Sequence, residues 1–162
     1  MNIREKYCLA VLNCILKISS VQAETGPLNF VGKWIPPGGT TLVSIEQKDN
    51  LFNLRILEQS DDRIQQELTS DQNNPDPSLR KRSLKGLLIS ENLQLNSANE
   101  LRGKLYDPAS GRTYNTTITS LDSDHLEIRG YHGLKFFGRS QIWTSRALFL
   151  TNTLKLLKEN LC

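Results

Sequence analysis

From residue 29 onward the chain is a series of short segments in which apolar and polar residues alternate, separated by turn-forming residues. Residues 41–47 and 51–57 alternate in this way on either side of Lys48-Asp49-Asn50, which predicts a β-hairpin. The other segments with strand character are 30–34, 84–89, 100–106, 113–121, 125–131 and 140–144. About eight strands spaced near ten residues apart are typical of an antiparallel β-barrel or β-sandwich, so we expect an all-β fold.

The first 23 residues have a different character from the rest of the chain. Arg4 and Lys6 make a basic start, residues 8–18 are mostly apolar, and Val21-Gln22-Ala23 matches the pattern at which a signal peptidase cuts. We therefore predict a signal peptide over residues 1–23 and an exported protein, periplasmic or secreted. A lysine interrupts the apolar run, and the alternative is an N-terminal helix of the folded protein. The run is too short and too interrupted for stable membrane insertion.

The charge balance and the cysteines exclude several functional classes once this segment is removed. The chain from Glu24 onward carries 17 basic and 16 acidic residues, which argues against nucleic-acid binding and against a polybasic membrane anchor. Only Cys162 remains of the three cysteines, so no internal disulfide is expected. His125 and His132 have no cysteine pair or carboxylate cluster beside them, so we expect no metal site and no cofactor.

Residues 58–82 form a long polar stretch, which predicts either a functional loop or a solvated surface segment. Asn74-Pro75-Asp76 is expected to be structural, because its polar side chains can cap backbone groups while the proline fixes the path. Arg80 and Arg82 are candidate ligand-binding residues, since a lid with two arginines could hold a carboxylate or phosphate. The alternative, which we favour, is a loop held by its own hydrogen bonds, with the arginines reaching Asp71 or Asp76.

Alternation in the segment 125–131 separates two faces of a strand. Leu126 and Ile128 share one face, whereas Arg129 and Tyr131 share the other. If the apolar pair faces the interior, the polar row faces solvent. If the barrel has a polar lumen, Arg129 and Tyr131 would contact a ligand there, so both are candidate ligand-binding residues.

The end of the chain changes from strand to helix spacing. Ser145 can cap a helix. The apolar residues that then recur on one helical face are Ala147, Leu150, Leu154, Leu157 and Leu161. We predict an amphipathic helix over residues 147–162 that packs on the barrel wall, and a membrane or partner-binding helix is the alternative.

An ordered set of short motifs runs from residue 32 to residue 146. Its members are Gly32-Lys33-Trp34, Asp71, Asn74-Pro75-Asp76-Pro77-Ser78-Leu79-Arg80, residues 82–86, Tyr106-Asp107-Pro108, Ser110-Gly111, Thr113-Tyr114, Leu126, Arg129-Gly130-Tyr131, Phe137-Gly138-Arg139-Ser140-Gln141 and Trp143. With this set the chain resembles the exported bacterial family called Domain of Unknown Function 2147. The resemblance implies a lipocalin-like barrel over residues 24–146 and an uncharacterised biochemical activity.

Lipocalin-like barrels often carry a Gly-x-Trp in the first strand, and an arginine from the end of the last strand covers its indole. Gly32 and Trp34 fit the first part, and Arg146 or Arg139 fits the second. The cation–π contact would contribute roughly 0.5–2 kcal/mol. The alternative is an ordinary core tryptophan and an ordinary surface arginine. We expect these four residues and Trp143 to have structural roles.

The sequence contains no Gly-x-Ser-x-Gly nucleophile elbow, no P-loop and no dinucleotide-binding glycine pattern. We therefore expect a binding protein, not an enzyme, that holds a small apolar or amphipathic molecule inside a barrel of about eight strands. The alternative is a structural or protein-interaction module of the cell envelope, with a filled barrel and the 58–82 loop as its contact surface. An enzyme would need an acid–base pair formed only by folding, for example His125 with Asp76.

Overall fold

The computed structural model describes residues 30–61, 66–67 and 70–159 of the 162-residue chain. The predicted signal peptide, residues 1–23, lies outside the described residues. The strands are β1 (Gly32–Ile35), β2 (Thr41–Lys48), β3 (Leu51–Asp61), β4 (Gln66–Glu67), β5 (Leu88–Leu95), β6 (Glu100–Asp107), β7 (Arg112–Ser120), β8 (His125–Tyr131) and β9 (Arg139–Ser145). Two short 3-10 turns, η2 (Pro77–Leu79) and η3 (Lys135–Phe137), and the helix α2 (Arg146–Glu159) complete the described elements.

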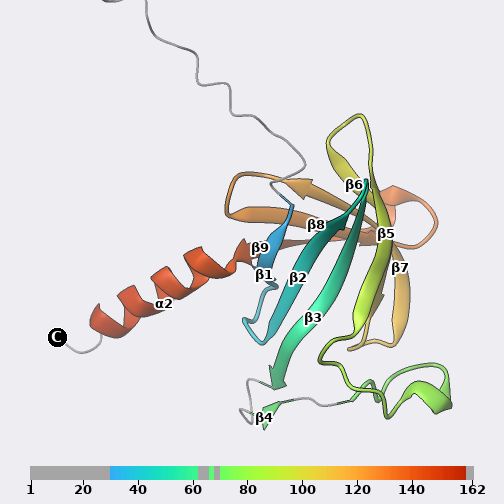
Figure 1. Ribbon diagram of the computed structural model, residues 1–162, viewed down its shortest axis with the longest axis horizontal. Helices are drawn as coiled ribbons and strands as arrows, with labels where there is room; N and C mark the ends of the chain where they lie inside the picture. The colour runs from blue at the N-terminus through green and yellow to red at the C-terminus, as the bar shows by residue number, and fades with distance from the viewer. Residues whose placement is uncertain (1–29, 62–65, 68–69, 160–162) are drawn as a thin grey trace, which may run out of the picture.

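The strands form one antiparallel sheet that closes on itself. Neighbouring strands follow the order β2-β1-β9-β8-β7-β6-β5-β3-β4, and an additional pairing between β2 and β3 joins the two sides. The result is a closed barrel of eight strands, with β4 as a short ribbon at the end of β3 (Figure 1). The contact between the first and last strands of the barrel, β1 and β9, is short and pairs Trp34 with Ser145 and Ile35 with Thr144. The all-β prediction and the expected strand number are confirmed.

The predicted hairpin is present, because β2 and β3 pair from Lys48↔Leu51 to Thr41↔Gln59. The prediction for β5 was wrong: a strand was expected over residues 84–89, whereas β5 begins at Leu88 and continues to Leu95. The register between β3 and β5 shifts twice, and Asn92 has a positive φ of 57°. This irregularity breaks the two-residue alternation, so the pattern in the sequence does not reveal the strand.

The interior of the barrel is lined by large apolar side chains from alternate strand positions. One cluster contains Phe30, Trp34, Val43, Ile45, Phe52, Leu54, Ile56, Ile89, Leu93, Leu101, Ile118, Leu126, Ile128 and Trp143, all buried. The rings of Phe30 and Phe52 meet edge to face, with centroids 6.1 Å apart. These side chains contact one another across the barrel, so this part of the interior is packed with protein atoms.

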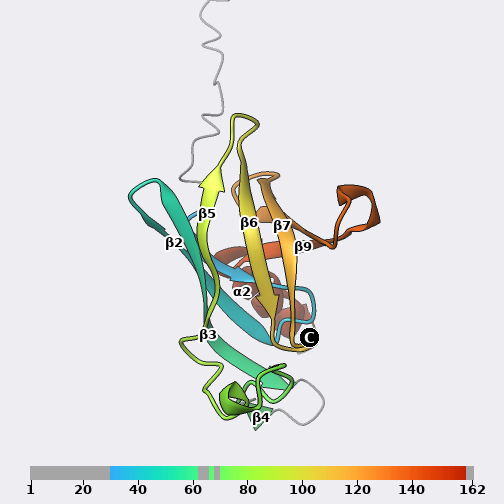
Figure 2. The same cartoon turned by 90° about the vertical axis from the view of Figure 1, so that its right-hand side faces the viewer.

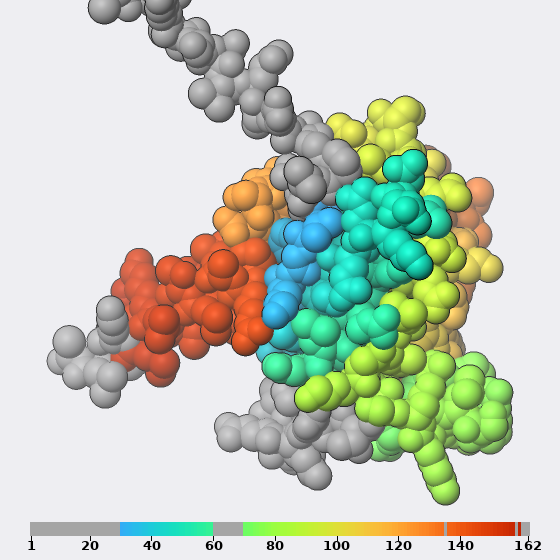
Figure 3. Space-filling view, in the orientation of Figure 1, coloured from blue at the N-terminus to red at the C-terminus, as the bar shows by residue number. Residues whose placement is uncertain are grey.

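The helix α2 begins where β9 ends and runs outward from the barrel (Figure 1). Ser145 caps it, because Ser145 Oγ accepts from the Leu148 backbone N–H at 3.2 Å and donates to Asp124 Oδ1. The prediction that the leucine face packs on the wall was wrong for most of the helix, since Leu154 and Leu157 are 60% and 54% exposed. Figure 3 shows that the start of the helix contacts the barrel beside β1. Of the helices in the described residues, none is long and apolar enough to cross a membrane.

Candidate functional site

The loop between β4 and β5 is folded around the carboxylate of Asp71, which is 0% exposed. Three side chains donate hydrogen bonds to it: Tyr106 Oη to Oδ1 at 2.6 Å, Asn74 Nδ2 to Oδ2 at 2.8 Å, and Arg82 Nε to Oδ2 at 2.8 Å. Arg82 Nη2 also lies 2.8 Å from Oδ2 and completes an ion pair. A carboxylate can be buried only if charged and hydrogen-bonding groups replace water around it, and Asp71 has both.

Tyr106 connects this cluster to the barrel, because it belongs to β6. The Arg82 guanidinium lies over the Tyr106 ring, 5.4 Å from its centroid, and Asn74 Nδ2 donates to Tyr106 Oη at 3.1 Å. The backbone N–H of Asp71 donates to the carbonyl of Arg82 at 3.1 Å, which draws the two ends of the loop together. Four side chains therefore hold the loop closed and fasten it to the barrel.

The turn that follows is built by side chains that bond their own backbone. Asn74 Oδ1 accepts from the Asp76 N–H, and Asp76 Oδ1 accepts from both the N–H and the hydroxyl of Ser78. These two hydrogen bonds from Ser78 lower the pKa of Asp76. Arg80 Nε donates to the Asn74 carbonyl at 2.8 Å. The structural role of Asn74-Pro75-Asp76 stays a prediction, and these contacts are of the kind that it requires.

The loop also docks on the turn between β6 and β7. Asn73 Nδ2 donates to the carbonyls of Pro108 and Ala109 at 3.3 and 3.0 Å. Gly111 has a φ of 66°, and a Cβ at this position would collide with the Asn73 carbonyl. Only glycine allows the two backbones to approach this closely. The loop is therefore anchored both to β6, through Tyr106, and to the β6–β7 turn, through Asn73.

The hydrogen bonds of both predicted loop arginines are to other residues of the loop, and Arg82 also contacts the Tyr106 ring. Arg82 reaches Asp71, as one of the two sequence interpretations expected, and Arg80 holds the Asn74 carbonyl. These bonds favour the interpretation in which the loop is held by its own hydrogen bonds over the one in which the arginines form a ligand-binding lid. Ligand binding by Arg80 and Arg82 stays a prediction, and their remaining N–H groups are the donors that could serve it.

We predict that Tyr106→Phe removes part of the alkaline sensitivity of folding. Burial, followed by the hydrogen bond and charge of Asp71, raises the pKa of Tyr106 above its usual value of 10.0. Because the folded-state pKa is the higher one, the associated stability is present below pH 10 and is lost as pH rises through the raised pKa. Thermal melts from pH 8 to pH 11.5 should show a steeper alkaline loss for the wild type than for Tyr106→Phe. Parallel pH profiles would contradict this role.

The strand β8 places its polar row on the outside of the barrel. Leu126 and Ile128 are buried in the interior cluster, so Arg129 and Tyr131, which alternate with them, face outward. Arg129 Nη1 donates to Ser140 Oγ at 3.0 Å and Nη2 to the Phe136 carbonyl at 3.5 Å. The alternative in which Arg129 and Tyr131 face the barrel lumen is therefore wrong, because Leu126 and Ile128 occupy the lumen side of β8.

The predicted stacking of an arginine on Trp34 is also corrected. Trp34 points inward, is 3% exposed, and donates its indole N–H to the Phe30 carbonyl at 2.9 Å. Gly32 lies beside the same indole, where a Cβ would stand 3.4 Å from Nε1. Arg146 begins α2 outside the wall and Arg139 begins β9 in an exposed position. Among the described residues, the arginine–aromatic stack is that of Arg82 on Tyr106.

Trp143 lies on β9 and is buried inside the barrel, and its structural role stays a prediction. It is 5% exposed and belongs to the interior cluster. It pairs with Leu126 of β8, and its indole N–H donates to Gln141 Oε1 at 3.4 Å. The two tryptophans of the chain, Trp34 and Trp143, are thus both core residues.

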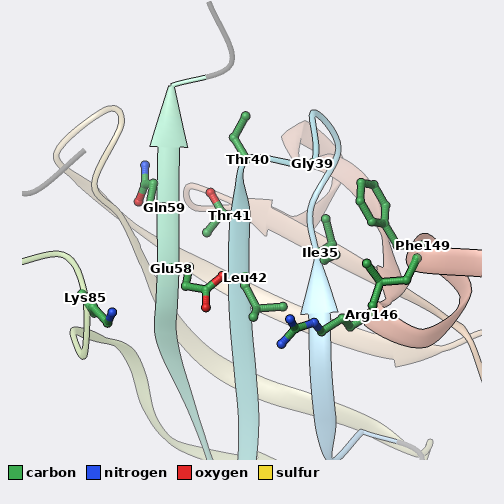
Figure 4. A pocket seen from close by; sticks show the side chains of 11 residues that line it. Ile35, Gly39, Thr40, Thr41, Leu42, Glu58, Gln59, Lys85, Arg146 and Phe149 are labelled. Atoms are coloured by element: carbon green, nitrogen blue, oxygen red, sulfur yellow. The ribbon is translucent and has the colours of Figure 1, made fainter. Parts of the chain in front are cut away.

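A pocket of about 440 Å³ lies outside the barrel, between α2 and the outer faces of β1, β2 and β3. Its lining includes Ile35, Leu42, Phe149, Leu150, Glu58, Lys85 and Arg146. In Figure 4 the Arg146 side chain runs along the wall toward Leu42, and Glu58 lies on the other side of that leucine. Within the described residues, no hydrogen bond or ion pair engages the charged groups of Arg146 and Lys85. The pocket thus combines an apolar floor with two available cations.

The acid–base pair considered from the sequence, His125 with Asp76, does not form. His125 Nδ1 lies 2.9 Å from Asp122 Oδ2, whereas Asp76 bonds Ser78. His125 begins β8 beyond the β7–β8 turn, and the loop of Asp76 docks at the opposite end of the barrel, on the β6–β7 turn. His132 contacts the Tyr114 ring, with centroids 4.6 Å apart. In the part of the chain that is described, no group of three or more potential metal ligands comes together.

Comparison with known proteins gives one family and one solved structure. The family model described as "Uncharacterized protein conserved in bacteria", DUF2147, matches residues 32–145. The chain belongs to this family. No curated protein matches it. The solved structure is protein HP1028 from Helicobacter pylori, which is described as belonging to the lipocalin family. That match has 22% identity and a TM-score of 0.63, and it covers 78% of this chain and 88% of the other. It identifies the fold as lipocalin-like.

In this DUF2147 protein, motifs far apart in the sequence meet in the Asp71 cluster. Asp71, Asn74 and Arg82 come from one loop, whereas Tyr106 lies 35 residues beyond Asp71. Sequence reasoning anticipated the bond from Arg82 to Asp71 but not the contribution of Tyr106. It also missed the outer pocket, because Ile35 and Leu42 carry no chemical signal beyond that of strand residues. Arg146 was singled out for a contact with Trp34 and instead lines this pocket.

Proposed function

We propose that this DUF2147 protein is a binding protein, not an enzyme, that holds a small amphipathic molecule with an acidic group. The binding place is the outer pocket between α2 and β1–β3. We further propose that the protein is exported and acts in the periplasm or after secretion, as the character of residues 1–23 suggests. The observation that carries the ligand proposal is a pocket with four apolar side chains and with two cations, Arg146 and Lys85, that have no partner among the described residues.

The apolar part of the pocket is supplied by four side chains from two different layers. Ile35 and Leu42 come from the outer faces of β1 and β2, and Phe149 and Leu150 come from α2. A volume of about 440 Å³ lies within the range of small-molecule sites. An alkyl or aromatic body placed here would be covered on the barrel side by the strands and on the other by the helix.

The charged part determines which end group is favoured. Arg146 and Lys85 contribute two positive charges and Glu58 one negative charge. A carboxylate or phosphate beside the Arg146 guanidinium would gain charge-assisted hydrogen bonds that the protein itself leaves unused in the described residues. A ligand with an acidic head and an apolar body therefore fits better than a neutral one.

The packed interior favours this location over the barrel lumen. The fourteen-residue cluster occupies the space that a lumen ligand would need. A ligand in the centre would have to displace close-packed side chains. Each displaced side chain would lose its packing contacts with its neighbours, which destabilises the fold. The outer pocket needs no such rearrangement.

We predict that decanoate binds the protein and that Arg146→Ala weakens this binding roughly tenfold, the loss expected for one charge-assisted contact. Isothermal titration calorimetry with decanoate, decanol and decyltrimethylammonium would measure the effect of the head group. The wild type should prefer decanoate, and Arg146→Ala should lose that preference. Arg112→Ala, an exposed arginine at the start of β7, is the matched control and should bind as the wild type does.

Two results would contradict this proposal. One is equal decanoate affinity of the wild type and Arg146→Ala. The other is a methyl NMR titration in which Leu101 and Ile118 of the interior shift while Ile35 and Leu42 of the pocket do not. The second result would return the ligand to the barrel lumen.

The filled interior also favours a second candidate, a structural or protein-interaction module with no small ligand. The anchored loop around Asp71 would then be its contact surface, since its fixed shape suits recognition by a protein partner. Native mass spectrometry of gently purified protein, alone and with decanoate, decanol or decyltrimethylammonium added, separates the two. A chain that takes up none of the three amphiphiles supports the module.

A further inference from the structure

The connection between β8 and β9 carries three apolar side chains that contact almost nothing. Leu134, Phe136 and Phe137 are 68%, 91% and 82% exposed. We call them the aromatic tip. Figure 2 shows this connection standing out from the barrel, well away from its wall. Two neighbouring phenylalanines exposed to this degree are unusual, because aromatic residues normally bury most of their surface.

The exposure is built into a folded turn. The Phe137 N–H donates to the Leu134 carbonyl at 3.2 Å, which closes η3. Arg129 reaches out from β8 and donates to the Phe136 carbonyl and to Ser140 Oγ. At Gly138 a Cβ would stand 2.8 Å from the Gly130 carbonyl, so glycine lets the turn return closely against β8. The backbone of this turn is therefore held by contacts with β8, while its apolar side chains remain exposed to solvent.

The sequence that contains the tip carries charges of one sign. Residues 128–145 include Arg129, Lys135 and Arg139 and contain no acidic residue. Arg139 is exposed at the start of β9, directly beyond the turn. Such a segment, with aromatic residues at its end and basic residues next to them, has the composition of elements that lie in the interface of an anionic membrane.

The size and shape of the tip distinguish a membrane from a protein partner. An aromatic side chain buries about 150–250 Å², so the three residues together offer on the order of 500 Å². A stable protein interface needs about 800 Å² on each side. A protruding tip of this size is too small for such an interface, whereas a lipid headgroup layer can accept it without a complementary cavity.

We propose that the aromatic tip docks this protein reversibly on an anionic lipid surface. Phe136 and Phe137 enter the interfacial region, and Arg139 remains at the level of the negatively charged headgroups. The protein lies on the membrane and does not span it. This contact is independent of the outer pocket, because α2 and the aromatic tip lie on opposite sides of the barrel in Figure 1.

Vesicle co-sedimentation of the chain from Glu24 onward tests the proposal. We expect binding to phosphatidylcholine vesicles that contain about one third phosphatidylglycerol, and weaker binding to phosphatidylcholine alone. The double variant Phe136→Ser/Phe137→Ser should bind the anionic vesicles with an affinity reduced by a factor of about ten or more, since two large apolar groups are lost. Arg139→Glu should reduce binding several-fold and flatten its salt dependence. All three substituted residues are exposed, and circular dichroism would verify that the variants fold.

The leucine face of α2 supplies the matched control. Leu154→Ser/Leu157→Ser removes a smaller exposed apolar surface, from two side chains 60% and 54% exposed, on the other side of the molecule and should leave vesicle binding unchanged. A fluorescent version of the comparison uses Phe136→Trp and Leu157→Trp. Because Trp34 and Trp143 are buried, the added indole is the solvent-exposed one. Its emission should shift to the blue with anionic vesicles in Phe136→Trp and not in Leu157→Trp.

Three results would overturn the proposal. The first is a wild-type protein that does not sediment with the anionic vesicles. The second is a loss of binding in the α2 double variant equal to that in the tip double variant. The third is a tip variant that binds vesicles like the wild type but changes from dimer to monomer in light scattering, which would make the tip a contact between proteins.

Discussion

Asp71→Ala is expected to lower the free energy of unfolding by about 3 kcal/mol, within the range for breaking a buried ion pair. The substitution leaves Arg82 without its carboxylate, and it removes the acceptor of Tyr106 Oη and Asn74 Nδ2. Arg82 is one third exposed and can regain water, which keeps the loss at the lower end of that range. Urea titration followed by circular dichroism measures the loss as a lower midpoint.

The matched control for Asp71→Ala is Asp76→Ala in the same loop. Asp76 is exposed and its partner Ser78 can bond water instead, so this change should have a much smaller effect. A double-mutant cycle with Arg82→Ala isolates the pair, and a large coupling energy is expected between positions 71 and 82. If Asp71→Ala and Asp76→Ala destabilise the protein equally, the cluster does not hold the loop.

The two loop carboxylates also illustrate what the sequence could predict. Asp71, Asn74 and Arg82 lie within one polar segment, so the pattern of residues indicated a loop that holds itself together. Tyr106 belongs to β6, and only the pairing order of the strands brings it to Asp71. A contact of this kind depends on topology and register, which alternation of polar and apolar residues does not specify.

The barrel itself was predictable because its strands alternate cleanly. Leu126 and Ile128 on β8 point inward as the two-residue period requires, and the same period places Arg129 outside. β5 escaped the prediction because Asn92 and the shifted register with β3 interrupt that period. For α2, helical spacing identified residues of one face but not what that face contacts. Leu154 remains exposed because α2 runs outward from the barrel after Ser145, and helical spacing does not specify that direction.

The outer pocket results from two features of the same kind, an irregular strand register and the direction of α2. A bulge between Leu42 and Val43 shifts the register of β2 on β3, so that Leu42 pairs with Glu58 and Val43 with Ile56. Leu42 alternates with the inward-facing Val43 and so lies on the outer face beside Ile35, where the first turn of α2 brings Arg146 and Phe149, and the bulge places Glu58 opposite Leu42 on that same face. Neither the bulge nor the direction of the helix has a signature in the residue pattern. The candidate site is therefore a product of irregularity in an otherwise regular barrel.

The largest loss of stability is expected for Trp34→Ala, at about 4 kcal/mol, which corresponds to a fall in melting temperature on the order of 10 °C. The indole lies in the middle of the interior cluster, and its removal leaves a cavity surrounded by close-packed side chains. It also leaves the Phe30 carbonyl without its donor. Trp34→Phe keeps most of the apolar volume and should lose roughly half as much.

A double-mutant cycle with Arg146→Ala distinguishes the packed tryptophan from an arginine-capped one. If Arg146 covered Trp34, the two changes would be coupled, and the double variant would lose less stability than the two single losses added together. The structure places Trp34 inside the wall and Arg146 outside it, so we expect the losses to add within about 0.5 kcal/mol. A coupling above about 1 kcal/mol would restore the cation–π closure. Additivity would leave Arg146 available for the acidic group of a ligand, since its charge would contribute little to folding.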